Sequence, residues 1–115
     1  MYCANAGDSR AVASQKGQAI ELSEDHKPDL PTERKRVVAA GHMVEDGRVD
    51  GIIAISRAIG DWEYKSTNLE APKMAVSAFP EVRKFEISKD LDFVICACDG
   101  IWDCMTSQAA VDFVY

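Results

Sequence analysis

The segment from Phe93 to Asp103 constrains the fold more than any other part of this sequence. Six apolar residues, Phe-Val-Ile-Cys-Ala-Cys, end abruptly on Asp99 and Gly100, and a second acid follows at Asp103. An apolar run of this length is typical of a buried strand, and the glycine allows the backbone to turn sharply. Asp99 is therefore predicted at the end of a rigid strand, where a scaffold can hold an oxygen ligand for a hard metal ion.

The length and charge of the chain exclude several classes of protein. A chain of 115 residues has room for one small domain, and no run approaches the roughly 20 apolar residues of a membrane-spanning helix. The net charge is −6, and no basic block is long enough to bind phosphates along a nucleic acid. The densest basic patch, Glu33 to Arg36, is interpreted as a solvated helix face. The sequence predicts neither a nucleic-acid partner nor a membrane span.

The cysteines and the first residues indicate the compartment. None of the four cysteines has the spacing of a zinc site. Cys96 and Cys98 alternate within the predicted strand and would point to one face, as expected of buried apolar thiols in a reducing compartment. Residues 1–5 have neither the basic region nor the apolar core of a secretory signal. We expect an intracellular protein, cytoplasmic or nuclear.

Hydrophobic periodicity predicts short strands separated by turns. The first three predicted strands would form an antiparallel meander, and Asp46-Gly47 is a strong hairpin signal between two of the later ones. Residues 61–73 show no sustained period and are expected to be a long surface loop. The predicted strands are 2–5, 10–14, 19–22, around 43–44, 48–49, 52–55, 81–87 and 93–98.

Two helices are predicted beside these strands. The first covers residues 32–40, begins at a cap formed by Asp29 or Thr32, and would bury Val37 and Ala40. The second follows a cap at Thr106 or Ser107 and would bury one apolar face, formed by Ala110, Phe113 and Val114.

Four segments, in this order along the chain, resemble one known family. They are Ala4–Val12 with its Gly-Asp-Ser-Arg sequence, Ser23–Pro28, Ser56–Asp61 and Ala97–Asp103. Together they resemble the metal-dependent serine/threonine protein phosphatases of the 2C type. The resemblance implies an α+β fold, part of a four-layer α-β-β-α sandwich of two antiparallel sheets flanked by helices. It also implies two divalent ions, Mn²⁺ or Mg²⁺, and a third that binds more weakly.

The resemblance carries over to individual residues. Asp99 matches an aspartate that binds the two core metal ions, Asp103 matches an acid of the third site, and Asp8 matches a position that shares this third site. Arg36 lies near the position of an arginine that approaches the phosphoprotein substrate. Two further signature residues, Arg57 and Asp61, are interpreted as structural, because such side chains beside glycine turns commonly bond to the backbone.

The family's reaction needs more ligands than this sequence offers. The resemblance implies hydrolysis of phosphoserine or phosphothreonine by a water molecule that two metal ions activate. The family's Asp-Gly-His-Gly-type motif and its carboxy-terminal Asp-Asn motif do not occur in residues 1–115. We therefore expect part of a phosphatase catalytic domain that is inactive by itself, because several carboxylates must neutralise two neighbouring cations.

Two alternatives remain beside this interpretation. One is a noncatalytic, phosphatase-like module that binds a partner protein. The other is an aspartyl-phosphate enzyme with Asp99 as nucleophile, which the sequence disfavours because Asp99 and Asp103 are four residues apart and no Asp-x-Asp motif is formed. Trp102 is predicted to pack inward and anchor the turn, rather than to be exposed for docking of a substrate.

Overall fold

The computed structural model describes all residues from 1 to 115, and they divide into two compact units. The first unit comprises residues 1–5, 9–25 and 81–115, and the second comprises residues 6–8 and 26–80. None of the helices combines the length and the apolar character that are needed to cross a lipid bilayer.

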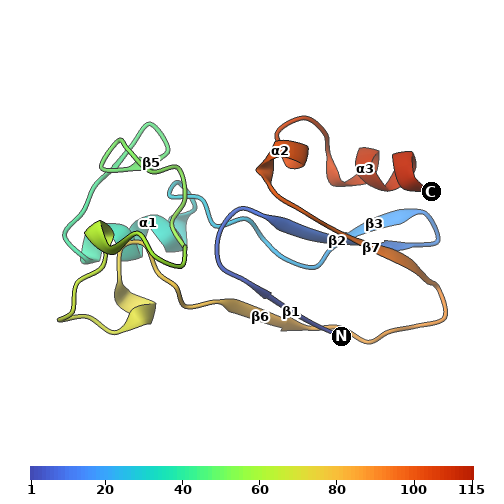
Figure 1. The fold of residues 1–115 in the computed structure, drawn as a ribbon, viewed down its shortest axis with the longest axis horizontal. Coiled ribbons are helices and arrows are strands. Elements are labelled where there is room, and N and C mark those ends of the chain that lie inside the picture. Colours follow the sequence, from blue (N-terminus) through green and yellow to red (C-terminus); the bar gives the residue numbers. More distant parts are fainter. The chain divides into compact units, whose positions relative to one another are not determined.

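The first unit contains two antiparallel sheets (Figure 1). In one, β1 (Tyr2–Asn5) pairs with β6 (Glu81–Lys84). In the other, β2 (Arg10–Gln15) lies between β3 (Gln18–Glu21) and β7 (Leu91–Ala97). These strands lie close to their predicted positions. The predicted meander is confirmed for β2 and β3, which pair antiparallel, and is wrong for β1, which pairs with the sequence-remote β6 and not with its neighbour β2.

Two helices cover one face of the three-stranded sheet. The short α2 (Asp99–Trp102) follows β7, and α3 (Ser107–Val114) packs on β3 and β2 (Figure 1). The predicted cap of α3 is confirmed, since the Thr106 side chain accepts a hydrogen bond of 3.1 Å from the Ala109 N–H. The core under these helices consists of Val12, Trp102, Ala110 and Val111.

The predicted buried face of the last helix is only partly correct. Ala110 and Val111 are buried, but Phe113 is 86% exposed and Val114 is 56% exposed. Phe113 is two residues from Val111, which turns its side chain by about 200° around the helix and away from the sheet.

The apolar run of β7 is covered on one face only. Phe93, Ile95 and Ala97 pack against the core of the first unit. The alternate residues Cys96 and Cys98 are exposed. The expectation of buried thiols on this strand is therefore wrong, because α2 and α3 cover only the opposite face of the sheet.

The second unit is built around α1 (Pro31–Ala39) and a small hairpin of β4 (Val44–Glu45) and β5 (Arg48–Val49). The hairpin confirms its turn signal, since Asp46 and Gly47 have φ angles of 51° and 71°, as a type I′ turn requires. Two 3₁₀ turns, η1 (Trp62–Tyr64) and η2 (Ala71–Lys73), interrupt the predicted long loop. The core of this unit consists of Val37, Val49, Ala58, Tyr64 and Val76.

Two details of this unit differ from the predictions. The N-cap of α1 is Leu30, and not Asp29 or Thr32; it makes no capping bond, because its apolar side chain has no acceptor atom, whereas Pro31 suits the first helical turn, where its missing N–H would be unpaired in any case. The predicted strand over residues 52–55 is reduced to a single bridge between Val49 and Ile53.

Candidate functional site

Asp99 and Asp103 lie on one short helical turn directly after β7. Asp99 is the first residue of α2, and the Asp103 N–H donates a hydrogen bond of 2.7 Å to the Asp99 carbonyl. Both side chains are exposed. Because the strand end and the helical turn fix the backbone at both positions, the two carboxylates are presented to solvent from a rigid support.

Trp102 holds this turn against the sheet. Its side chain is only 8% exposed, and its indole Nε1–H donates a hydrogen bond of 2.8 Å to the carbonyl of Ala97, the last residue of β7. The inward packing predicted for Trp102 is confirmed, and its exposure for docking is excluded. The indole thus connects the turn that carries Asp99 to the strand that precedes it.

Arg10 lies over the same indole. Its guanidinium carbon lies 5.1 Å from the centre of the Trp102 ring. Nε and Nη2 bond to the two carboxylate oxygens of Asp25 at 2.9 and 2.8 Å, and Nη1 donates to the Ser107 hydroxyl at 2.9 Å. The hydrogen bond with Asp25 raises the pKa of Arg10 above its ordinary value. Arg10 therefore ties Trp102 to the start of α3.

Asp8 belongs to the second unit, where its carboxylate is paired. The Lys27 ammonium lies 2.5 Å from the Asp8 carboxylate, and the Asp8 side chain is 17% exposed. Two further bonds connect the same pair of segments. The His26 N–H donates to the Gly7 carbonyl at 2.8 Å, and the Gly7 N–H donates to His26 Nδ1 at 3.1 Å.

Glu33 is the centre of a buried charge network in the second unit. It is 2% exposed, and it accepts two hydrogen bonds from Arg57, one from Arg36 and one from the Ser56 hydroxyl, at 2.8 to 3.0 Å. Burial alone would raise the pKa of Glu33, but the bonds from Arg57 and Arg36 outweigh it and hold the pKa at about 2. The network joins α1 to the Ser56–Arg57 segment.

Arg36 bonds to groups inside the second unit. Besides Glu33, its guanidinium donates to the backbone carbonyls of Ser56, Met74 and Ala75, and its side chain is 12% exposed. The prediction that Arg36 contacts substrate stays a prediction. The patch from Glu33 to Arg36 is a solvated face only in part, since Arg34 and Lys35 are exposed whereas Glu33 is buried.

Arg57 was interpreted as structural, and its bonds to Glu33 agree with this interpretation. Asp61 precedes the 3₁₀ turn η1, but its side chain makes no capping bond to that turn. Sequence reasoning missed Glu33 itself. Its spacing of three residues from Arg36, on one face of a helix, was the available signal.

The chain does not by itself provide a complete metal centre. No group of three or more His, Cys, Asp or Glu side chains lies close enough together to hold a metal ion. A pair of divalent ions needs several carboxylates around it, so residues 1–115 alone do not fit the two core ions of the resembled family.

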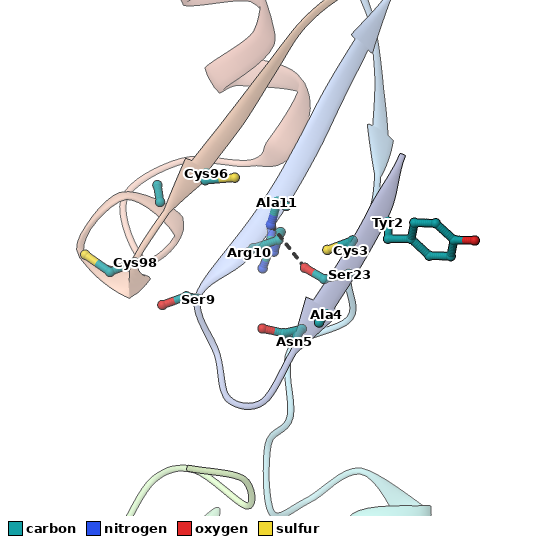
Figure 2. A pocket seen from close by; sticks show the side chains of 11 residues that line it. Tyr2, Cys3, Ala4, Asn5, Ser9, Arg10, Ala11, Ser23, Cys96 and Cys98 are labelled. Atoms are coloured by element: carbon teal, nitrogen blue, oxygen red, sulfur yellow. Dashed lines mark hydrogen bonds between the residues drawn. The ribbon is translucent and has the colours of Figure 1, made fainter. Parts of the chain in front are cut away.

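A cavity of about 510 Å³ opens between the two sheets of the first unit, with Cys3 and Cys96 on its walls (Figure 2). Its lining offers no carboxylate. Burial and the neighbouring Cys96 both raise the pKa of the Cys3 thiol, which makes this thiol a weaker nucleophile at neutral pH. The cavity therefore lacks the ligands of a hard-metal site.

Known proteins align with this chain over nearly all of its residues. It is 56% identical over 114 residues to Protein phosphatase 2C homolog 3 of Schizosaccharomyces pombe, covering 99% of this chain and 28% of the relative. It is 53% identical over 116 residues to Probable protein phosphatase 2C 60 of Arabidopsis thaliana, covering 100% of this chain and 32% of that protein. The chain thus spans about a third of the length of these relatives.

Solved structures agree with the sequence comparison. A phosphatase from a pathogenic strain of Toxoplasma gondii matches with a TM-score of 0.86 and 38% identity over 96% of this chain and 35% of the other. A Caenorhabditis elegans sex-determining protein matches with a TM-score of 0.85 and 28% identity over 98% of this chain and 27% of the other. These matches confirm the predicted α+β fold. All residues from 1 to 115 match the Protein phosphatase 2C family model, and the chain belongs to this family, whose members depend on metal ions.

Proposed function

We propose that this chain forms part of the catalytic domain of a protein serine/threonine phosphatase that uses Mn²⁺ or Mg²⁺ to hydrolyse phosphoserine and phosphothreonine in protein substrates. The observation that carries the proposal is the placement of Asp99. It lies at the junction of β7 and α2, on a turn fixed by the buried Trp102, within a family match that covers every residue.

We assign different roles to the acidic residues. Asp99 contributes a ligand to the two core metal ions, and the remaining ligands come from chain segments outside residues 1–115. Asp103 and Asp8 contribute to a third site with weaker affinity. The role of Asp99 is supported by its exposed position at the start of α2, directly after β7. We also propose an intracellular location, which the four free cysteines support.

A noncatalytic binding module is the competing function. It is favoured by one observation, that this chain holds no group of three metal ligands. The two proposals differ in whether the segment supports turnover when the rest of a catalytic domain is present.

A graft tests the proposal directly. In the grafted enzyme, residues 1–115 replace the aligned segment of the S. pombe relative, to which they are 56% identical. We expect hydrolysis of a phosphothreonine peptide that requires Mn²⁺ or Mg²⁺. A folded graft that binds the metal but shows no hydrolysis would favour the noncatalytic module.

A further inference from the structure

A groove in the second unit is lined by exposed apolar side chains. It has a volume of about 530 Å³, and its lining comes from residues 52–53 and 61–64, which include the 3₁₀ turn η1. Ile52 and Trp62 in this lining are 67% and 80% exposed, whereas Tyr64, which also lines the groove, belongs to the core of the unit. Large apolar side chains around a hollow at the surface are typical of an interaction site.

Backbone hydrogen bonds fix both walls of this groove. In one wall, the Val49 N–H donates to the Ile53 carbonyl at 2.9 Å, and the Ile52 N–H donates to the Val49 carbonyl at 2.9 Å. In the other wall, the Tyr64 N–H donates to the Asp61 carbonyl at 3.0 Å and closes η1. The groove is therefore preformed, and a partner that binds there loses little affinity to ordering of this protein.

The rim of the groove is acidic. Asp61 and Glu63 line it, and both are exposed. Burial raises the pKa of Tyr64, and the carboxylates of Glu63, Asp50 and Asp61 raise it further. The phenol that lines the groove therefore experiences a negative potential from three carboxylates.

The neighbouring cations do not neutralise this rim. Arg48 Nη1 donates to the Ile52 carbonyl at 2.8 Å, and Lys65 Nζ donates to two backbone carbonyls. No salt bridge of the second unit includes Asp61 or Glu63. Both carboxylates are therefore available to a cation from outside the chain.

We propose that this groove binds a segment of a partner protein in which large aliphatic side chains are flanked by lysine or arginine. The aliphatic side chains pack between Ile52 and Trp62, and the flanking cations lie beside Asp61 and Glu63. An anionic membrane surface fits the groove less well, because the same carboxylates repel it. This binding needs no metal ion and does not depend on the proposed phosphatase reaction.

Fluorescence anisotropy of labelled peptides with the grafted enzyme tests this proposal, because the graft surrounds the groove with a complete catalytic domain. The three probe peptides share a glycine-serine frame and have Lys-Ile-Leu-Lys, Lys-Ser-Ser-Lys or Glu-Ile-Leu-Glu at the centre. We expect the Lys-Ile-Leu-Lys peptide to bind at least about tenfold more tightly than either of the others, and to do so without metal.

Variants of the groove test each part of the recognition. Trp62→Ala removes one wall and should weaken binding of the Lys-Ile-Leu-Lys peptide by at least about tenfold. Glu63→Lys should weaken binding of the same peptide and bring the Glu-Ile-Leu-Glu peptide within about threefold of it. Phe79→Ala and Glu70→Lys are the matched controls and should leave all affinities unchanged, because Phe79 and Glu70 are exposed in the same unit but do not line the groove.

Several results would overturn the proposal. Equal binding of the Lys-Ile-Leu-Lys and Lys-Ser-Ser-Lys peptides would mean general attraction to an acidic protein, and equal losses in Trp62→Ala and Phe79→Ala would place binding outside the groove. Absence of binding by all three peptides would also overturn it. Cosedimentation with vesicles of phosphatidylcholine and phosphatidylserine, or formation of a dimer, would assign the groove to a membrane or to a second copy if Trp62→Ala abolished it.

Discussion

Trp102 and Ala97 are joined by a hydrogen bond of 2.8 Å from the indole Nε1–H to the backbone carbonyl. Ala97 ends β7 and Trp102 ends α2, so this bond closes the turn that contains Asp99. The indole also packs in the core with Val12 and Val111. One side chain thus links the hydrophobic core of the first unit to the proposed metal ligand.

Replacement of Trp102 should therefore affect folding before it affects chemistry. Truncation of a buried aromatic side chain costs about 3 to 5 kcal/mol, which is comparable with the whole stability of a small domain. We expect Trp102→Ala in the grafted enzyme to lower the melting temperature strongly, as measured by circular dichroism. Trp102→Phe retains most of the apolar volume but loses the bond to Ala97. Its melting temperature should therefore lie between those of the parent and Trp102→Ala.

Kinetics on the same variants test whether Trp102 has a role in substrate docking. A Trp102→Ala variant with an unchanged melting temperature and a raised KM for protein substrates would contradict the anchoring role. Ile101→Ala is a suitable control, because Ile101 is the neighbouring residue and is 41% exposed. It should change the melting temperature much less.

Local sequence patterns predicted the elements of this fold but not their pairing. The Asp46-Gly47 hairpin was predictable, because its turn, its register and its strands lie within six residues. The pairing of β1 with β6 joins residues about 80 positions apart, and no turn signal encodes it. The apolar run of β7 indicated a strand, but hydrophobicity alone could not tell which of its faces would be covered.

In the candidate site, too, features formed by adjacent residues could be predicted, and features formed by residues remote in sequence could not. The Asp99-Gly100 turn and the inward packing of Trp102 follow from adjacent residues and were predicted. The buried state of Glu33 depends on Arg57, which is 24 residues away, so neighbouring exposed residues such as Lys35 gave the helix a misleading solvated character. The pairing of Asp8 with Lys27 likewise requires two motifs to be brought together by the bonds between Gly7 and His26.

Asp99→Asn should separate metal binding from folding. The change retains the shape of the side chain and removes the charge, so in the grafted enzyme both Mn²⁺ affinity and turnover should fall steeply, by at least about a hundredfold for turnover. Folding should persist, because an exposed acid makes little contribution to stability. Titration calorimetry with Mn²⁺ and a peptide phosphatase assay provide the two measurements.

The matched control for Asp99 is Asp46→Asn. It makes the same chemical change in the hairpin turn, where asparagine tolerates the positive φ of 51°. Full activity of Asp99→Asn at saturating Mn²⁺ would show that Asp99 is not a ligand of the core metal ions.

The 115-residue chain alone should bind metal weakly and lack activity. It holds no group of three ligand side chains, so two adjacent divalent ions would be left with uncompensated repulsion. We expect calorimetric titration with Mn²⁺ to show no tight pair of sites, and hydrolysis of a phosphothreonine peptide to stay at the level of the buffer. The grafted enzyme is the positive control. Two tight Mn²⁺ sites in the isolated chain would contradict the proposed division of ligands.

Glu33 should make the stability of the fold depend on pH in the acid range. Its pKa is about 2 in the folded protein and 4.5 when unperturbed, so its contribution is fully present above about pH 4.5 and is lost as the pH falls through 2. The shift corresponds to about 3 kcal/mol. Glu33→Gln removes the buried charge but leaves Arg36 and Arg57 beside a neutral partner. This change should lower the free energy of unfolding by about 3 to 5 kcal/mol at pH 7.

Urea unfolding of the grafted enzyme without metal, repeated between pH 7 and pH 2, measures this effect. The difference in the free energy of unfolding between the parent and Glu33→Gln should be largest above pH 4.5 and shrink towards pH 2, where the carboxyl of the parent becomes protonated. Glu63→Gln, a change of an exposed carboxyl in the same unit, should show only a small difference at any pH. A difference for Glu33→Gln that stays constant from pH 7 to pH 2 would mean that loss of packing, and not the buried carboxylate charge, accounts for the destabilisation.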